Sequence, residues 1–156
     1  MDIQKTVEEL TTEEKASLVA GVNFMFTYPV PRLGIPSLHM SDGPHGLRVQ
    51  TEGGDNGVTN SLPATSFPTA ATVASSWNPE NSYKIGCAIG KEAHKYGIHV
   101  VLGPGVNIKR NPTAGRNFEY FSEDPLLAGK MASAEVKGIQ GEGVGVSVKH
   151  FALKNS

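Results

Sequence analysis

Cysteine is almost absent from this sequence of 156 residues, which contains only Cys87. A single cysteine excludes an internal disulfide, and with it the cross-linked framework of small secreted domains. We expect Cys87 to fill part of the core. The amino terminus has acidic residues where a signal peptide needs basic ones, and no stretch approaches the apolar length of a membrane span. These features predict a soluble, cytoplasmic protein with no membrane partner.

Charge of one sign is also lacking. The 14 basic residues nearly balance the 15 acidic ones, and no run of like charges occurs. This excludes the basic surface that usually binds nucleic acid. Hydrophobic residues make up 38% of the chain, and the 18 glycines bring the composition to that of an ordinary globular protein. The balanced charge favours a neutral ligand.

Motifs for nucleotides and metals are missing as well. The sequence has no GxxxxGK[ST] phosphate loop, and its five histidines and one cysteine show no metal-ligand spacing. Gly103, Pro104 and Gly105 follow a predicted strand, but the third glycine of a dinucleotide fingerprint is absent and no helix begins there. We therefore expect neither a metal nor a cofactor.

Helix and strand patterns alternate along the chain. Capping residues and apolar periodicity predict helices over 12–20, 79–96 and 125–140. Thr11 and Glu14 fit a capping box, and Gly21 suits a left-handed stop to the first helix. Short apolar runs predict strands over 37–41, 98–102 and 144–148, while 69–74 fits either a buried strand or the start of a helix. Residues 50–68 are predicted to form a long excursion.

This order predicts parallel βαβ units, which occur in doubly wound open sheets and in (β/α)8 barrels. A barrel needs about 250 residues, so length alone favours an open sheet, which would fit a small enzyme of unrelated chemistry. Polar residues favour the barrel. Asp42, the segment 107–116 and the pair Lys149 and His150 each follow a predicted strand, and parallel folds bind ligands at that edge. Carboxylate, guanidinium, ammonium and imidazole groups together suit a neutral, polyhydroxylated ligand such as a sugar.

Five segments, in order, resemble the start of a glycoside hydrolase family 3 β-glucosidase. They are LHMSDGPHGLR (38–48), SLPATSFPTAATVASSWNP (61–79), GPGVN (103–107), GRNFEYFSEDP (115–125) and VKHF (148–151). The resemblance implies an α/β fold in which residues 1–156 form the N-terminal strands and helices of a partial (β/α)8 barrel. It also implies hydrolysis of terminal β-linked sugars with retention, through a glycosyl-aspartate.

The resemblance further implies which residues bind the substrate. Asp42, Arg116, Lys149 and His150 are expected to hold the non-reducing sugar in the deepest subsite. Asp42 and Glu119 would look like a catalytic pair from the sequence alone. In the family, however, the nucleophile lies downstream in a Ser-Asp-Trp type motif and the acid/base follows later, so no catalytic residue is expected in this chain. Glu119, Glu123 and Asp124 are expected to orient Arg116 or to cap the helix that starts at Pro125.

The residues after Phe151 bear on specificity. The N-acetylglucosaminidase branch of the family has KHFPGHGDT, and Ala152 and Leu153 break that pattern, which favours a glucosidase or xylosidase. We therefore expect a β-glucosidase fragment that binds a β-glucoside or short β-linked oligosaccharide and is inactive alone. The alternative is a truncated homologue that acts as a sugar-binding or assembly module, completed by another chain or by self-association.

Overall fold

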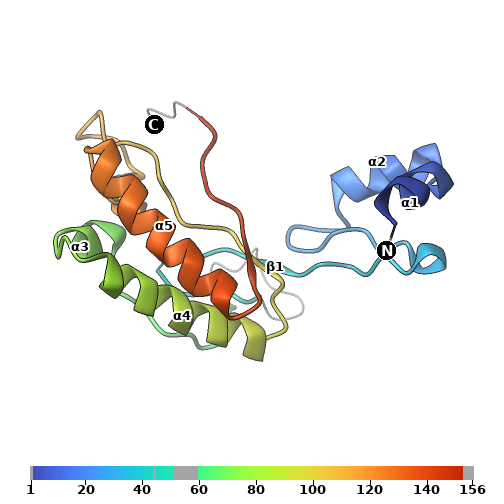
Figure 1. Ribbon diagram of the computed structural model, residues 1–156, viewed down its shortest axis with the longest axis horizontal. Coiled ribbons are helices and arrows are strands. Elements are labelled where there is room, and N and C mark those ends of the chain that lie inside the picture. The colour runs from blue at the N-terminus through green and yellow to red at the C-terminus, as the bar shows by residue number, and fades with distance from the viewer. Residues whose placement is uncertain (1, 44, 51–59, 153–156) are drawn as a thin grey trace. The chain divides into compact units, whose positions relative to one another are not determined.

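The computed structural model in Figure 1 describes residues 2–43, 45–50 and 60–152. The chain contains two compact units, Met1–Met40 and Ser41–Ser156. Residues 51–59 of the excursion predicted over 50–68 lie outside the described residues. Its described end, 60–68, has no helix, and Ser61 pairs there with Gln50 in an isolated antiparallel bridge.

The first unit contains α1 (Ile3–Glu9), α2 (Thr12–Ala20) and the short 3₁₀ helix η1 (Pro31–Leu33). The prediction of α2 is confirmed, including its capping box: Glu14 N donates to the Thr11 hydroxyl at 3.2 Å, and Thr11 N donates to the Glu14 carboxylate at 2.9 Å. Gly21 ends α2 with a φ of 78°, but its ψ of 161° is extended. The expected left-handed helical stop is therefore wrong. The sequence did not predict α1, which buries none of its residues and so has no apolar periodicity.

The strands are β1 (Met40–Ser41), β2 (Val100–Val101) and β3 (Gly145–Val146), in the sheet order β1-β2-β3. Strands β2 and β3 are parallel, with Val100 opposite Gly145. Each strand lies where the sequence predicted one but is shorter. Backbone pairing continues beyond β3, because Lys149 N donates to Pro104 O at 3.0 Å and Val106 N donates to Lys149 O at 2.8 Å. This pairing fixes the backbone of Lys149 next to the chain that follows β2.

The helices of the second unit are α3 (Ala70–Ala74), α4 (Pro79–Lys95) and α5 (Pro125–Gly141), with the 3₁₀ helix η2 (Asn117–Glu119). The predictions of α4 and α5 are confirmed, and Asn78 and Asp124 accept a backbone N–H at their amino ends. The ambiguous segment 69–74 is helical, because the Thr69 hydroxyl caps α3 by accepting from Thr72 N. In the described part of the chain, every helix is too short or too polar to cross a membrane.

Helices α4 and α5 lie side by side (Figure 1). Two glycines allow this contact: a Cβ on Gly86 would lie 2.3 Å from Glu135 O, and one on Gly138 would lie 2.3 Å from Tyr83 O. The helices share a core cluster with the strands and the segments beside them, formed by Leu47, Val49, Ile89, Ala93, Ile98, Val101, Ile139 and Val144. A second cluster joins α3 to α5 through Ala70, Val73, Ala74, Phe121, Ala128, Met131 and Ala132. Cys87 is half-buried.

One charged residue lies on the buried face of α5. Glu135 is only 5% exposed, and its backbone is the part of α5 that Gly86 approaches. Burial disfavours the ionised carboxylate and raises the pKa of Glu135 to about 8. The apolar pattern of α5 predicts the helix face correctly but did not predict that this face holds an acid.

Candidate functional site

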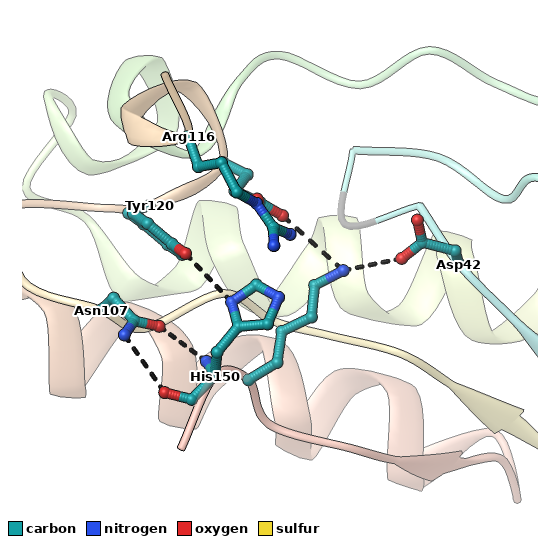
Figure 2. A network of polar contacts seen from close by, with 7 residues as sticks. Asp42, Asn107, Arg116, Tyr120 and His150 are labelled. Atoms are coloured by element: carbon teal, nitrogen blue, oxygen red, sulfur yellow. Dashed lines mark hydrogen bonds and ion pairs between the residues drawn. The ribbon is translucent and has the colours of Figure 1, made fainter. Parts of the chain in front are cut away.

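Polar side chains from three segments meet in the network of Figure 2. Asp42 follows β1, Arg116 and Glu119 lie at η2, and Lys149 and His150 follow β3. Parallel strands place their carboxyl ends at one edge of a sheet, which explains why residues so distant in the sequence can meet. The structure brings Asp42 and Lys149 into direct contact, and Arg116 joins them through Glu119.

Asp42 and Lys149 form the central ion pair. The Lys149 ammonium donates to Asp42 Oδ1 at 2.7 Å, and the Lys149 side chain is 14% exposed. Burial by itself would raise the pKa of Asp42. The Lys149 hydrogen bond and charge, the Gly43 N–H and the Arg48 charge outweigh burial and lower that pKa. Asp42 therefore stays a carboxylate that can accept further hydrogen bonds.

Arg116 and Glu119 form a second ion pair beside the first. Arg116 Nε donates to Glu119 Oε1, and this hydrogen bond raises the pKa of Arg116. Glu119 is almost completely buried, and its Oε2 lies 3.6 Å from Lys149 Nζ. The expectation that an acid orients Arg116 is thus met by Glu119, while Asp124 caps α5 and Glu123 is exposed.

The backbone and the ring of His150 are held separately. Asn107 Oδ1 accepts from His150 N at 2.6 Å, and Asn107 Nδ2 donates to His150 O at 3.1 Å. The Tyr120 hydroxyl lies 3.0 Å from His150 Nδ1, and the two rings meet edge to face. Sequence reasoning included Asn107 only as the start of the polar segment 107–116 and gave Tyr120 no role, although the two residues lie in the motifs GPGVN and GRNFEYFSEDP.

Two cavities adjoin this network. A cavity of about 670 Å³ is lined by residues that include Asp42, His45, Arg48, Arg116, Phe118 and Glu119. Lys149 and His150 line a neighbouring cavity of about 470 Å³ together with Asn107. The four predicted site residues are therefore connected by contacts but divided between two cavities, with the Lys149 ammonium reaching from the second toward Asp42 of the first.

The loop after Asp42 shapes the larger cavity. Its backbone closes as Arg48 N donates to Asp42 O at 2.9 Å, and a Cβ on Gly46, whose φ is 145°, would lie 2.2 Å from Thr65 O. His45 Nε2 accepts from Ala70 N at 2.9 Å, which ties the loop to the start of α3. Burial lowers the pKa of His45, so the ring is a neutral acceptor. Sequence reasoning missed His45 and Arg48, although both lie in the motif that supplied Asp42.

The network places ionised acceptors and donors next to one another. Both carboxylates, Asp42 and Glu119, are paired with cations, which fix their positions. Asp42 and Arg116 line the same cavity and present an acceptor and a donor that match the hydroxyl groups of a neutral ligand. Among the residues that the structure describes, no group of three or more His, Cys, Asp or Glu is placed to hold a metal ion.

The chain is similar to known proteins over nearly all of its length. Residues 32–155 match the Glycosyl hydrolase family 3 N terminal domain. The chain is 51% identical, over 99% of its length, to thermostable beta-glucosidase B of Acetivibrio thermocellus, of which it covers 21%. It is also 51% identical to an exo-alpha-(1->6)-L-arabinopyranosidase of Bifidobacterium longum, over 96% of this chain and 20% of that protein. The chain thus spans about a fifth of the length of these relatives.

Solved structures give the same result for the fold. Beta-glucosidase 3B from Thermotoga neapolitana, in complex with alpha-D-glucose, matches with a TM-score of 0.89 and 43% identity, over 99% of this chain and 24% of that one. The α/β fold matches the N-terminal barrel domain of these β-glucosidases, so the partial barrel is confirmed and the open sheet is wrong. From the family model and these relatives together, we conclude that the chain belongs to glycoside hydrolase family 3.

Proposed function

We propose that this chain supplies the deepest sugar-binding subsite of a retaining β-glucosidase, which hydrolyses terminal, non-reducing β-D-glucosyl residues. The observation that carries the proposal is the pair of linked ion pairs, Asp42 with Lys149 and Arg116 with Glu119, beside a cavity of about 670 Å³. The glucose complex of the Thermotoga relative supports glucose as the ligand.

Each of the four site residues has a distinct role in this proposal. Asp42 accepts hydrogen bonds from two neighbouring hydroxyls, because an ionised carboxylate has about four acceptor positions. Arg116 and Lys149 donate to sugar oxygens, and His150 donates or accepts. A carboxylate hydrogen bond to a hydroxyl that strengthens in the transition state lowers the barrier as well as binding the substrate.

The nucleophile and the general acid/base of this enzyme lie outside the 156 residues. A retaining glycosidase needs one free carboxylate that attacks the anomeric carbon and one acid that protonates the leaving oxygen. Asp42 and Glu119 are both paired with cations, which suits binding. The relatives are about five times longer than the chain, which leaves room for two further carboxylates. We expect the 156 residues alone to be inactive.

Hydrolysis of 4-nitrophenyl β-D-glucopyranoside by the full-length native protein tests the proposal. Asp42→Asn should lower kcat/KM by about 100-fold, since the sugar then loses a hydrogen bond to a charged group. The exposed Glu123→Gln should keep the wild-type rate and serves as the control. Absence of hydrolysis by the wild-type protein, or an Asp42→Asn variant as active as the wild type, would refute the proposal.

A second candidate substrate is an α-L-arabinopyranoside. The Bifidobacterium exo-alpha-(1->6)-L-arabinopyranosidase is as similar to the chain as the Acetivibrio glucosidase, at 51% identity each. Arabinopyranose lacks the exocyclic hydroxymethyl group of glucose, so a site that contacts this group discriminates between the sugars. Comparing kcat/KM for the 4-nitrophenyl glycosides of β-D-glucose, β-D-xylose and α-L-arabinopyranose decides between them. A preference for arabinopyranoside would overturn the glucoside assignment but not the family.

Two expectations from the sequence remain predictions. Cell fractionation would test the cytoplasmic location. Size-exclusion chromatography would test whether the chain associates with another copy or another chain, and a monodisperse monomer would contradict the assembly module.

A further inference from the structure

We propose that Glu119 is a positioning residue that holds the cations Arg116 and Lys149 in the places from which they contact the sugar. The inference rests on the proposed function for the identity of the ligand. It adds to that function a buried carboxylate whose two oxygens face Arg116 and Lys149 and which acts through these two neighbours.

Glu119 faces a different cation with each of its oxygens. Its Oε1 accepts from Arg116 Nε, and its Oε2 lies 3.6 Å from Lys149 Nζ. The Glu119 side chain is 4% exposed, while that of Arg116 is 35% exposed. Glu119 thus contacts both cations from an almost fully buried position at the wall of the larger cavity, and ties the loop at η2 to the segment after β3.

The contact with Arg116 leaves the outer end of that side chain available. A guanidinium has five N–H donors in a fixed plane, and Glu119 takes the one on Nε. Within the described residues, the two terminal nitrogens of Arg116 have no acceptor, and Arg116 lines the larger cavity. Figure 2 shows the guanidinium directed toward the centre of the network. Glu119 therefore fixes the plane in which four N–H donors are presented to a ligand.

The contact with Lys149 balances the charge around Asp42. This set of four groups consists of the carboxylates of Asp42 and Glu119 and the cations Lys149 and Arg116. Removal of a buried carboxylate leaves the charge of its cation uncompensated. Without Glu119, Asp42 would be the one remaining carboxylate of this set for both cations. Its oxygens would then be occupied by Lys149 and Arg116 and would have fewer positions for sugar hydroxyls. Glu119 in this way keeps Asp42 available to the substrate.

Glu119→Gln tests this role sharply, because glutamine has nearly the same shape but only one acceptor oxygen and an NH₂ donor. The amide oxygen can face Arg116 or Lys149, and the NH₂ group then faces the other cation. One of the two cations must move. Since small misplacements of contacting groups can cost about 100-fold in rate, we expect kcat/KM for 4-nitrophenyl β-D-glucopyranoside to fall about 10- to 100-fold.

The kinetics of the full-length native protein give the first measurement. We expect Glu119→Gln to raise KM and lower kcat, and Glu119→Asp, which keeps both acceptors, to recover part of the loss. Glu123→Gln removes an exposed carboxylate from the same segment and should keep wild-type values. Thermal unfolding of each variant reports whether the fold is intact. Wild-type kcat and KM in a folded Glu119→Gln variant would overturn the inference.

Crystal structures of the wild type and Glu119→Gln without ligand give a second measurement that does not depend on activity. We expect the side chain of Arg116 or of Lys149 to move while the backbone of η2 stays in place. Both cations in their wild-type positions would overturn the inference even if the protein hydrolysed β-glucosides. Conversely, a displaced cation in a protein that does not hydrolyse them would refute the proposed function and leave the positioning role standing.

Discussion

Glu135 gives the most quantitative prediction, because burial disfavours the ionised form of its carboxyl group. It lies on α5 at the contact with α4 and is 5% exposed. Burial raises its pKa to about 8, from an ordinary value of 4.5. Glu135→Gln removes the ionisation while nearly preserving the shape, so it isolates the cost of the charge.

The size and sign of the effect follow from the two pKa values. Between about pH 4.5 and pH 8 the unfolded chain has released the proton of Glu135, whereas the folded chain still binds it. The unfolded state then binds fewer protons, so stability falls as the pH rises through this window and levels off above it. Each unit of pKa difference corresponds to about 1.4 kcal/mol, which gives a total of roughly 3 to 5 kcal/mol.

Urea unfolding at a series of pH values from 5 to 9 measures this effect. The free energies of unfolding of wild type and Glu135→Gln should be similar at pH 5, and the variant should become more stable by roughly 3 to 5 kcal/mol at pH 9. Glu123→Gln, which removes an exposed carboxylate, should follow the wild type at every pH. If Glu135→Gln and the wild type lose stability in parallel as the pH rises, the reasoning is refuted.

Two further predictions concern helix packing and the loop after Asp42. Gly138→Ala should lower the free energy of unfolding by about 1 to 3 kcal/mol, because its Cβ would lie 2.3 Å from Tyr83 O and force α4 and α5 apart. Gly129→Ala, on the same helix with open space around it, should instead raise stability by about 0.5 to 1 kcal/mol; equal melting temperatures for the two variants would contradict this. Below about pH 6.5 the unfolded chain binds a proton at His45 that the folded chain resists, so stability should fall as the pH falls. His45→Gln, which offers a neutral acceptor to Ala70 N, should remove that dependence in unfolding measurements at pH 5 and pH 7, and an unchanged dependence would contradict the role given to His45.

The sequence predicted those elements whose boundaries are set by local chemistry. The caps Thr11, Asn78 and Asp124 each bond a backbone N–H, and the helices begin where these residues indicate. Helix α1 was missed because it has no buried face. The strands came out shorter than predicted, because strand length depends on pairing with distant segments and not on the apolar run alone.

The candidate site was predictable in its members but not in its contacts. Strand ends and family motifs indicated Asp42, Arg116, Lys149 and His150. The ion pair between Lys149 and Asp42 joins opposite ends of the second unit, and no local pattern specifies it. The buried position of Glu119 depends likewise on how η2 packs. Only the folded chain shows which acid is exposed and which one holds two cations.

A crystal structure of the full-length native protein with bound glucose tests the central claim most directly. The account predicts glucose hydroxyls within hydrogen-bond distance of Asp42, Arg116, Lys149 and His150, with the Glu119 carboxylate still paired with Arg116 and beside Lys149. Glucose bound elsewhere, or bound without contact to Asp42 and Lys149, would contradict it.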